Sequence, residues 1–182
     1  MDDHEAMLRL LAADGPYRPY ADKLMLFGRF VGSWDLDILV HQADGTRREF
    51  SGEWHFDWVL EGRGIQDVLI VRPRGEQDKA SDPEGGIGST MRVYDPRMDA
   101  WWVSWMGPDD GEFSTLFARP TRDGRIVLDG QWSIGQKEGS RFEWSFSDIT
   151  DRSFRWQGRI SADGGASWRL AEEMDARRSA GG

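Results

Sequence analysis

Apolar and polar side chains alternate with a period of two in a series of short segments that begins at Gly32. Successive side chains of a β-strand point to opposite faces of its sheet, so this alternation is typical of strands with one buried and one solvated face. Turn-forming residues, mainly Gly, Asp and Pro, separate the segments. Ten strands are expected, at residues 32–40, 46–60, 64–71, 89–95, 100–106, 112–119, 125–133, 141–148, 153–161 and 167–177.

The connections between these segments argue against parallel pairing. A parallel pair needs a crossover of about a dozen residues or more, usually a helix, and no segment of helical pattern lies between two of the strands. The longest connection, the polar stretch Arg72–Gly88, could cover a barrel mouth as a lid. Because closure removes the exposed edges of an antiparallel sheet, the sequence predicts an all-β fold, a closed antiparallel β-barrel of about ten strands.

The beginning of the chain follows a helical pattern instead. Apolar residues recur at helical spacing within residues 7–11, and again from about residue 20 to residue 31. We therefore expect two short N-terminal helices. The expected organisation is a helical segment at residues 1–31 that packs on the barrel, a barrel domain at residues 32–178 and a disordered tail at residues 179–182.

Size, charge and composition exclude several classes of function. The length of 182 residues suits one domain. The formal net charge of −9 argues against a nucleic-acid partner, which needs a basic surface. There is no cysteine, so neither a disulfide nor a thiolate metal site can form. The acidic N-terminus is unlike a secretory signal and no apolar run approaches the roughly 18 residues of a membrane span, so we expect a cytoplasmic protein without a membrane partner.

Aromatic side chains dominate the predicted inner face of the barrel. The chain has ten Trp and nine Phe, and the alternation directs many of them to the same side of their strands. Each such side chain can bury roughly 150 to 250 Å², so together they can either line a lumen or fill it. If the barrel is hollow, its predicted walls include Trp54, Trp58, Trp105, Trp144 and Trp156.

The strand at residues 100–106 is largely apolar on both faces. Trp101 and Trp105 share one face, whereas Trp102 and Met106 share the other. An extended apolar face is usually covered in a soluble protein. We expect either the N-terminal helices or the second subunit of a homodimer to cover Trp102.

Four polar residues interrupt the apolar inner face. Asp67 and Glu172 share a face with aliphatic residues of their strands, and Arg92 and Tyr94 lie on one side of theirs. Buried charges persist where something pairs with them, so an internal salt bridge between Arg92 and one of the two carboxylates is one interpretation. The other is that these residues anchor a ligand inside an apolar pocket, as polar groups commonly do in small-molecule sites.

Glu53, His55 and Asp57 follow one another on one strand face in the order of a metal-ligand set. Alternate residues of a strand lie about 6.6 Å apart, so the outer two are too far apart to share one ion at bonding distances of about 2 Å. The only other histidines are His4 and His41. We therefore expect no metal and no cofactor. Motifs for acyl transfer and phosphate binding are also missing from the sequence, so no catalytic residue is assigned.

The segment Ser161–Trp168 resembles the Asp-box turn of sialidase-type propellers. Asp163 is placed to bond backbone amides two residues on, and Gly164 and Gly165 supply positive φ angles. In the propellers this turn recurs once per blade, whereas this chain has one copy and no repeat of blade length. We therefore interpret the segment as a device that stabilises one hairpin.

Four segments carry a broader resemblance, which covers most of residues 24–178. They are FGRFVGSWDLDI, WVLEGRGIQDV, MRVYDPRMDAWWVSW and FRWQGRISADGGASWRLAEEMDARR. In this order they resemble a bacterial family of lipocalin-like (calycin-like) β-barrel proteins of unknown function. The resemblance implies a ten-stranded barrel with a pocket at one end, and it brings no assigned activity. Gly32-Ser33-Trp34 is similar to the GxW opening of lipocalin-like barrels, which implies that Trp34 closes the barrel floor.

Three functions are compatible with these features. We expect binding of a small apolar or aromatic molecule in the barrel cavity, with the five tryptophans as walls and the four polar residues as anchors. The first alternative is a cyclase-type or isomerase-type enzyme that folds a hydrophobic substrate and excludes water, with Asp67 and Glu172 as its candidate acid–base groups. The second is a structural or interaction module with a packed interior. Fold alone does not choose among them.

Overall fold

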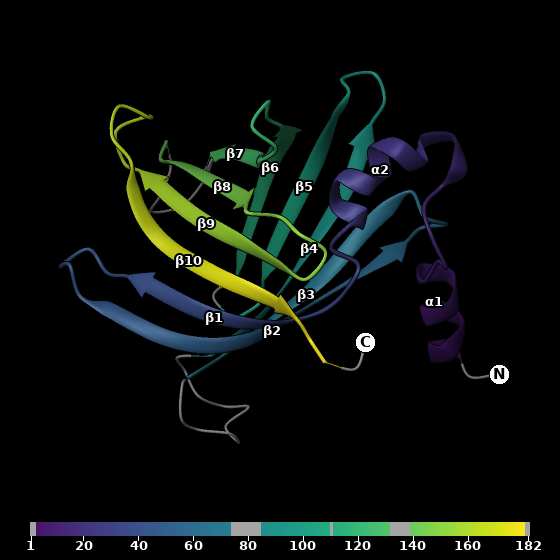
Figure 1. The fold of residues 1–182 in the computed structure, drawn as a ribbon, viewed down its shortest axis with the longest axis horizontal. Coiled ribbons are helices and arrows are strands. Elements are labelled where there is room, and N and C mark those ends of the chain that lie inside the picture. Colours follow the sequence, from purple (N-terminus) through teal and green to yellow (C-terminus); the bar gives the residue numbers. More distant parts are fainter. Residues whose placement is uncertain (1–2, 74–84, 110, 132–138, 181–182) are drawn as a thin grey trace.

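Backbone hydrogen bonds join ten strands into one closed antiparallel barrel in the computed structural model, which describes residues 3–73, 85–109, 111–131 and 139–180 (Figure 1). Each strand pairs with its neighbours in the sequence, and the last strand pairs with the first. The strands are β1 (Gly32–His41), β2 (Arg47–Val59), β3 (Gly64–Pro73), β4 (Gly86–Asp95), β5 (Ala100–Gly107), β6 (Glu112–Pro120), β7 (Ile126–Gln131), β8 (Arg141–Ser147), β9 (Ser153–Ser161) and β10 (Arg169–Arg178). The predicted all-β barrel is confirmed.

Two short helices precede the barrel, as predicted. They are α1 (Asp3–Leu11) and α2 (Ala21–Gly28), with a 3-10 turn, η1 (Arg18–Tyr20), between them. α2 lies across one end of the barrel, whereas α1 lies outside it (Figure 1). Backbone hydrogen bonds hold the chain after α1 to the end of β2, for example from Ala13 N–H to the Trp58 carbonyl at 3.1 Å. Neither helix has the length and apolar character needed to cross a bilayer.

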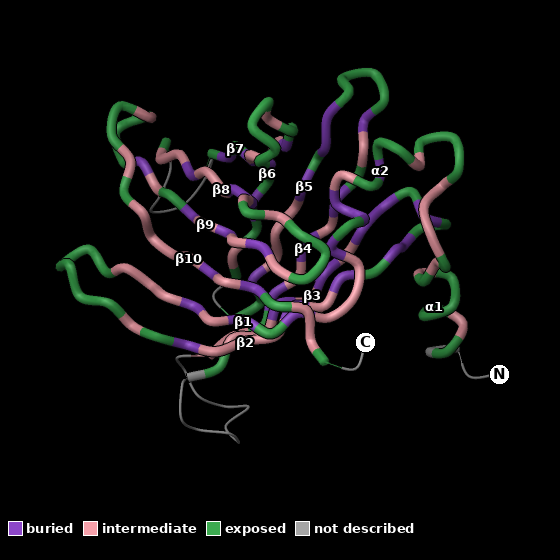
Figure 2. The backbone as a smooth tube through the Cα atoms, viewed as in Figure 1, coloured by how far each residue is buried: buried purple, intermediate pink, exposed green. Residues whose placement is uncertain are grey.

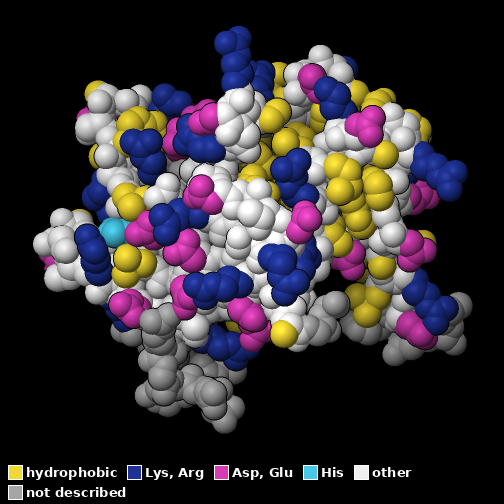
Figure 3. Space-filling model, viewed as in Figure 1, with side chains coloured by type: hydrophobic (Ala, Val, Ile, Leu, Met, Phe, Trp, Pro, Cys, Tyr) yellow, Lys and Arg dark blue, Asp and Glu magenta, His cyan; other side chains and the backbone are white. Residues whose placement is uncertain are grey.

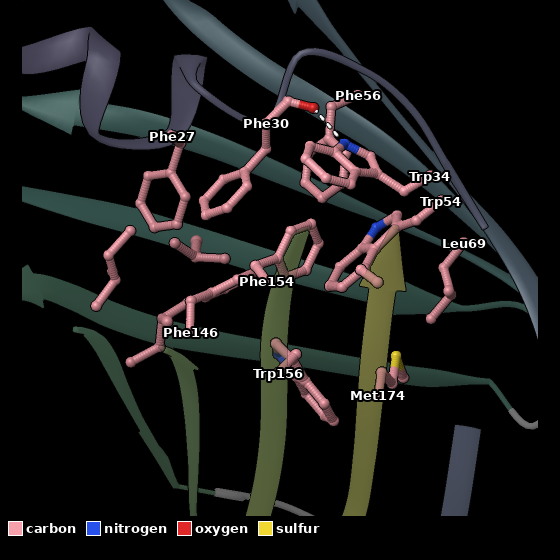
Figure 4. Close-up of a cluster of buried hydrophobic side chains, with 14 of the residues drawn as sticks. Phe27, Phe30, Trp34, Trp54, Phe56, Leu69, Phe146, Phe154, Trp156 and Met174 are labelled. Atoms are coloured by element: carbon pink, nitrogen blue, oxygen red, sulfur yellow. Dashed lines mark hydrogen bonds between the residues drawn. The ribbon is translucent and has the colours of Figure 1, made fainter. Parts of the chain in front are cut away.

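Aromatic rings fill the half of the barrel beneath α2 (Figure 4). The ring of Phe30, just after α2, lies 4.9 Å from that of Phe146 and 4.8 Å from that of Phe154, measured between centroids. The Trp34 indole donates a hydrogen bond to the Phe30 carbonyl at 2.7 Å, and the Arg178 guanidinium carbon lies 4.1 Å from the Trp34 ring centroid. This fully buried position agrees with the implied role of Trp34 in closing the barrel floor.

The two faces of the sheet differ as the alternation predicts. Figure 2 shows buried residues alternating with less buried ones along the strands. On β2, for instance, Trp54 and Phe56 are buried, whereas Glu53 and His55 between and before them are only half-buried. Figure 3 shows basic and acidic side chains interspersed over the face in view. The aromatic side therefore faces the interior, and the charged side faces solvent.

Trp102 lies on the outer face and is 46% exposed. The register places it between Val93 on β4 and Phe117 on β6, and its ring lies edge-on to that of Phe117 with centroids 5.0 Å apart. The N-terminal helices do not cover it, because α2 caps the end of the barrel instead of lying along the outer face of β5 (Figure 1). The homodimer that would cover Trp102 stays a prediction.

Some predictions fall on residues outside the described ranges. The connection predicted to act as a lid, Arg72–Gly88, is shorter than expected, since β3 continues to Pro73 and β4 begins at Gly86. The centre of that connection, residues 74–84, lies outside the described residues, as do the end of the seventh predicted strand and the last two residues of the predicted tail.

Candidate functional site

A cavity of about 220 Å³ occupies the half of the barrel away from α2. It lies near the starts of β6, β8 and β10 and the ends of β5 and β9, which are the strand ends opposite those that α2 covers. The interior is therefore packed at one end and hollow at the other, which removes the alternative of a fully packed barrel. The lining residues are Trp54, Leu69, Thr90, Trp105, Glu112, Phe142, Trp144, Trp156, Gly158, Arg159, Ile160, Ala171, Glu172 and Met174.

Four of the five predicted wall tryptophans line this cavity, and their rings follow one another around it. The ring centroids are 6.1 Å apart between Trp105 and Trp144, 5.6 Å between Trp144 and Trp156, and 6.5 Å between Trp156 and Trp54. Tilted and edge-to-face contacts at such distances are favourable for aromatic rings. Together the indoles form a continuous aromatic wall that comes from β2, β5, β8 and β9.

Two glycines allow indoles to approach the barrel wall closely. A Cβ atom on Gly88 would lie 2.0 Å from Cη2 of Trp105, and one on Gly158 would lie 2.7 Å from Cη2 of Trp156. Glycine within a strand commonly marks such a close approach.

The indole N–H groups of Trp54 and Trp156 are buried and have no hydrogen-bond acceptor among the described residues. The buried indole of Trp34, by contrast, is bonded to a carbonyl. Buried donors are rarely left unpaired, and those that are unpaired call for an explanation such as a water or a ligand. Both unpaired donors belong to side chains of the cavity wall.

Glu172 lies on the inner face of β10, as the alternation predicts, because it shares a face with the buried Met174. It pairs with the inward-facing position of Gly158. A β-bulge between Leu170 and Glu172 breaks the alternation on the other side, where Leu170 pairs with the exposed Arg159. Burial raises the pKa of Glu172 to about 7, because the ionised carboxylate is poorly solvated there. No described residue donates a hydrogen bond that would offset this effect.

Two further charged residues lie at the cavity, Glu112 on β6 and Arg159 on β9. The Ser114 hydroxyl donates a hydrogen bond to Glu112 Oε1 at 3.1 Å. Arg159 is exposed; its Nη1 lies 3.5 Å from Glu143 Oε1, and its guanidinium carbon lies 5.6 Å from the ring centroid of Trp168. Arg159 is therefore held at the rim by Glu143 and Trp168, and the charged group farther inside the cavity is the carboxylate of Glu172.

Asp67 and Arg92 form a buried salt bridge that does not line the cavity. Nη1 of Arg92 donates to Oδ2 of Asp67, and the Thr90 backbone N–H donates to Oδ1 of Asp67 at 2.9 Å. The guanidinium carbon lies 5.1 Å from the ring centroid of Phe27 and 5.2 Å from that of Phe56. Of the two interpretations of these residues, the structure therefore has the internal salt bridge.

Trp58 and Tyr94 also lie near α2 and away from the cavity. The indole of Trp58 packs so closely on α2 that a Cβ atom on Gly28 would lie 2.4 Å from its Cη2. The hydroxyl of Tyr94 donates to Asp99 at 2.8 Å, and Asp99 also accepts a bond from Lys23 at 2.7 Å. Alternation gives the face of a residue but not its height along the barrel, so it grouped both ends of the interior together.

The predicted hairpin device is present between β9 and β10. Asp163 accepts hydrogen bonds from the Ser167 N–H at 2.9 Å, the Ser167 hydroxyl at 2.6 Å and the Ser161 hydroxyl at 2.7 Å. These bonds hold the pKa of the Asp163 carboxyl well below its usual range. The Trp168 indole donates to the Gly165 carbonyl at 3.2 Å, which anchors the other side of the turn.

Sequence reasoning did not select several lining residues. Leu69 and Met174 are ordinary inward-facing apolar positions, and nothing in the pattern distinguishes them from those beneath α2. Thr90 is a small, buried polar residue whose backbone N–H bonds to Asp67. Glu112 and Arg159 belong to the cavity because of their height at the rim, which the strand register sets and the alternation does not.

Comparison with known proteins gives structural neighbours only. No family model and no curated protein matches the chain. The S-type phycobiliprotein lyase CPES from Guillardia theta superposes with a TM-score of 0.61 and 13% identity, covering 87% of this chain and 93% of that one. The protein Rv2717c from M. tuberculosis superposes with a TM-score of 0.63 and 15% identity, covering 88% and 99%. The likeness is one of fold. It is consistent with the lipocalin-like resemblance of the sequence.

Proposed function

We propose that this protein binds a small apolar or aromatic molecule in the cavity of its barrel. The observation that carries the proposal is the cavity of about 220 Å³, walled by four indoles and reached by one inner carboxylate. Small-molecule sites are typically concave and apolar, with few polar groups that fix the orientation of the ligand. A structural neighbour named as a phycobiliprotein lyase has the same kind of barrel, which adds support at the level of fold.

The size of the cavity limits the ligand. An engineered apolar cavity of about 150 Å³ holds benzene, and pockets for drug-sized ligands begin at about 300 Å³. The observed volume of about 220 Å³ lies between them. We therefore expect a compact ligand with a single ring or two fused rings.

Isothermal titration calorimetry with indole and 2-naphthol tests the proposal. The variant Leu69→Trp fills the cavity from β3, and the matched control Ile70→Trp adds the same side chain at the next position, which faces outward. We expect both compounds to bind the wild type, the affinity to fall about tenfold or more in Leu69→Trp, and the control to bind like the wild type. Absence of binding to the wild type, or equal affinity in Leu69→Trp, would contradict the proposal.

One observation favours the cyclase or isomerase alternative. Glu172 has a pKa raised to about 7 and lies at the cavity, and a carboxyl with such a pKa can transfer protons near neutral pH. Asp67, the other candidate, is engaged with Arg92 and does not line the cavity. If Glu172→Gln keeps ligand affinity but abolishes a turnover that the wild type shows, the enzyme alternative replaces simple binding.

Further parts of the proposal concern the chain as a whole. We propose membership of the bacterial lipocalin-like family of unknown function, a cytoplasmic location, no nucleic-acid partner and a division of the chain after residues 31 and 178. A homodimer through the outer face around Trp102 is also proposed, because that indole is 46% exposed. Sedimentation of the wild type and of Trp102→Ser tests the homodimer.

A further inference from the structure

We propose that the ligand is a cation: a one-ring or two-ring aromatic compound whose amine, or protonated ring nitrogen, pairs with Glu172 while its body lies against the four indoles. This inference rests on the proposed binding function and adds the charge of the ligand to it. It reverses the expectation that Arg92, a basic residue, anchors the ligand.

The charged side chains that line the cavity favour a cationic ligand. Among the described residues, the charged side chains that line it are Glu172, Glu112 and Arg159. Arg159 lies at the exposed rim and contacts Glu143 and the ring of Trp168. Arg92 is withdrawn into its salt bridge with Asp67. Glu172 has no basic partner among the described residues, so its carboxylate attracts a cation and repels a fatty acid or any other anionic ligand.

The aromatic wall of the cavity also favours a cation. Indole is the aromatic side chain that attracts a cation most strongly over its face, and amine ligands are commonly recognised by several aromatic rings around one charge. Trp54, Trp105, Trp144 and Trp156 are consecutive around the cavity, with neighbouring centroids 5.6 to 6.5 Å apart. These rings, on four different strands, can contact the ligand from several sides while its nitrogen approaches Glu172.

The electrostatic field of the whole protein acts in the same direction. The formal net charge is −9, so the protein attracts cations at long range, and a cavity bounded by apolar walls focuses this attraction. The long-range field and the inner carboxylate therefore favour the same charge of ligand.

Release of a proton from Glu172 on binding gives the inference a second signature. Burial keeps the Glu172 carboxyl largely protonated below neutral pH in the empty cavity, whereas a bound ammonium group would favour the ionised form. Among the described residues, the other titratable groups that line the cavity are Glu112 and Arg159. His41 follows Val40, the residue opposite Glu172 on β1, but its side chain bonds to Glu173 and not to Glu172. Affinity for an amine should therefore rise with pH around neutrality.

Three probes of the same shape test the charge preference: 2-naphthylmethylamine, 2-naphthylmethanol and 2-naphthoate. Calorimetry is performed with the wild type, with Glu172→Gln and with the matched control Glu173→Gln, the adjacent carboxylate that bonds to His41. We expect the wild type and the control to bind the amine about tenfold more tightly than the alcohol and to bind the naphthoate most weakly. In Glu172→Gln the amine and the alcohol should bind within about threefold of each other, and the rise of amine affinity between about pH 6 and about pH 8 should disappear.

Each result has a distinct meaning. If the alcohol or the naphthoate binds the wild type as tightly as the amine, and Leu69→Trp abolishes that binding, the cavity function stands and the charge preference is overturned. The preference is also overturned if Glu172→Gln retains it in full. If none of the three probes binds, the proposed function fails, and the charge preference fails with it.

Discussion

The buried pair of Asp67 and Arg92 gives a quantitative test of how this barrel is held together. Both side chains are almost fully buried, with 0% and 1% of their surface exposed. The substitution Asp67→Asn keeps an oxygen for the Thr90 amide but leaves the guanidinium charge uncompensated between two phenyl rings. Breaking a buried pair from one side costs about 3 to 5 kcal/mol of unfolding free energy, so this variant should lose about that amount.

The partner substitution completes a double-mutant cycle. Arg92→Met keeps an unbranched chain between Phe27 and Phe56 but leaves the carboxylate unpaired, which again costs about 3 to 5 kcal/mol. In the double variant no charge remains, and the residual cost is that of the unpaired asparagine amide, about 1 to 3 kcal/mol. The coupling free energy between the two positions should therefore be at least about 3 kcal/mol.

The measurement is urea unfolding, followed by tryptophan fluorescence and far-ultraviolet circular dichroism. The control is Arg177→Met, which breaks an exposed ion pair with Asp37 and should leave the urea midpoint unchanged. Two results would refute the reasoning. One is a double variant whose loss equals the sum of the single losses, and the other is a wild-type midpoint in either single variant.

Three further predictions concern pH and packing. The pKa of about 7 for Glu172, against its ordinary value of 4.5, makes the empty protein lose stability as pH rises between these values, so Glu172→Gln should gain up to about 3 kcal/mol at about pH 8 and little at about pH 4; equal effects in urea unfolding at both pH values would contradict this. The lowered pKa of Asp163 means that its bonds to Ser167 stabilise the hairpin above its ordinary pKa and are lost on acidification, so Asp163→Asn should flatten the acid limb of the stability curve measured by circular dichroism, and an unchanged limb would count against it. Trp34→Phe removes the donor to the buried Phe30 carbonyl and should cost about 1 kcal/mol or more in urea unfolding, whereas a wild-type midpoint would deny the bond a role in stability.

The sequence by itself determined the class of fold and the sorting of residues between the two faces of the sheet. Trp54, Trp144 and Trp156 face inward in the structure because a strand has a side-chain period of two, and a local pattern is enough to show it. The antiparallel pairing also followed from local information, since short connections cannot join parallel strands. The turn around Asp163 was equally readable, because its hydrogen bonds join residues close in sequence.

Tertiary structure decided which part of the inner face is a site. Trp58 and Trp156 have the same local pattern, yet one packs on α2 and the other lines the cavity, because their heights along the barrel differ. The bulge between Leu170 and Glu172 is a shift of register between two strands, so alternation alone placed Leu170 on the same face as Glu172, whereas Leu170 pairs with the exposed Arg159. Pairing of the neighbouring strands β3 and β4 likewise placed Arg92 beside Asp67, and Glu172 has no basic partner among the described residues. The charge of the cavity therefore depends on which charged side chains the pairing of the strands brings together, and the sequence of a single strand does not show it.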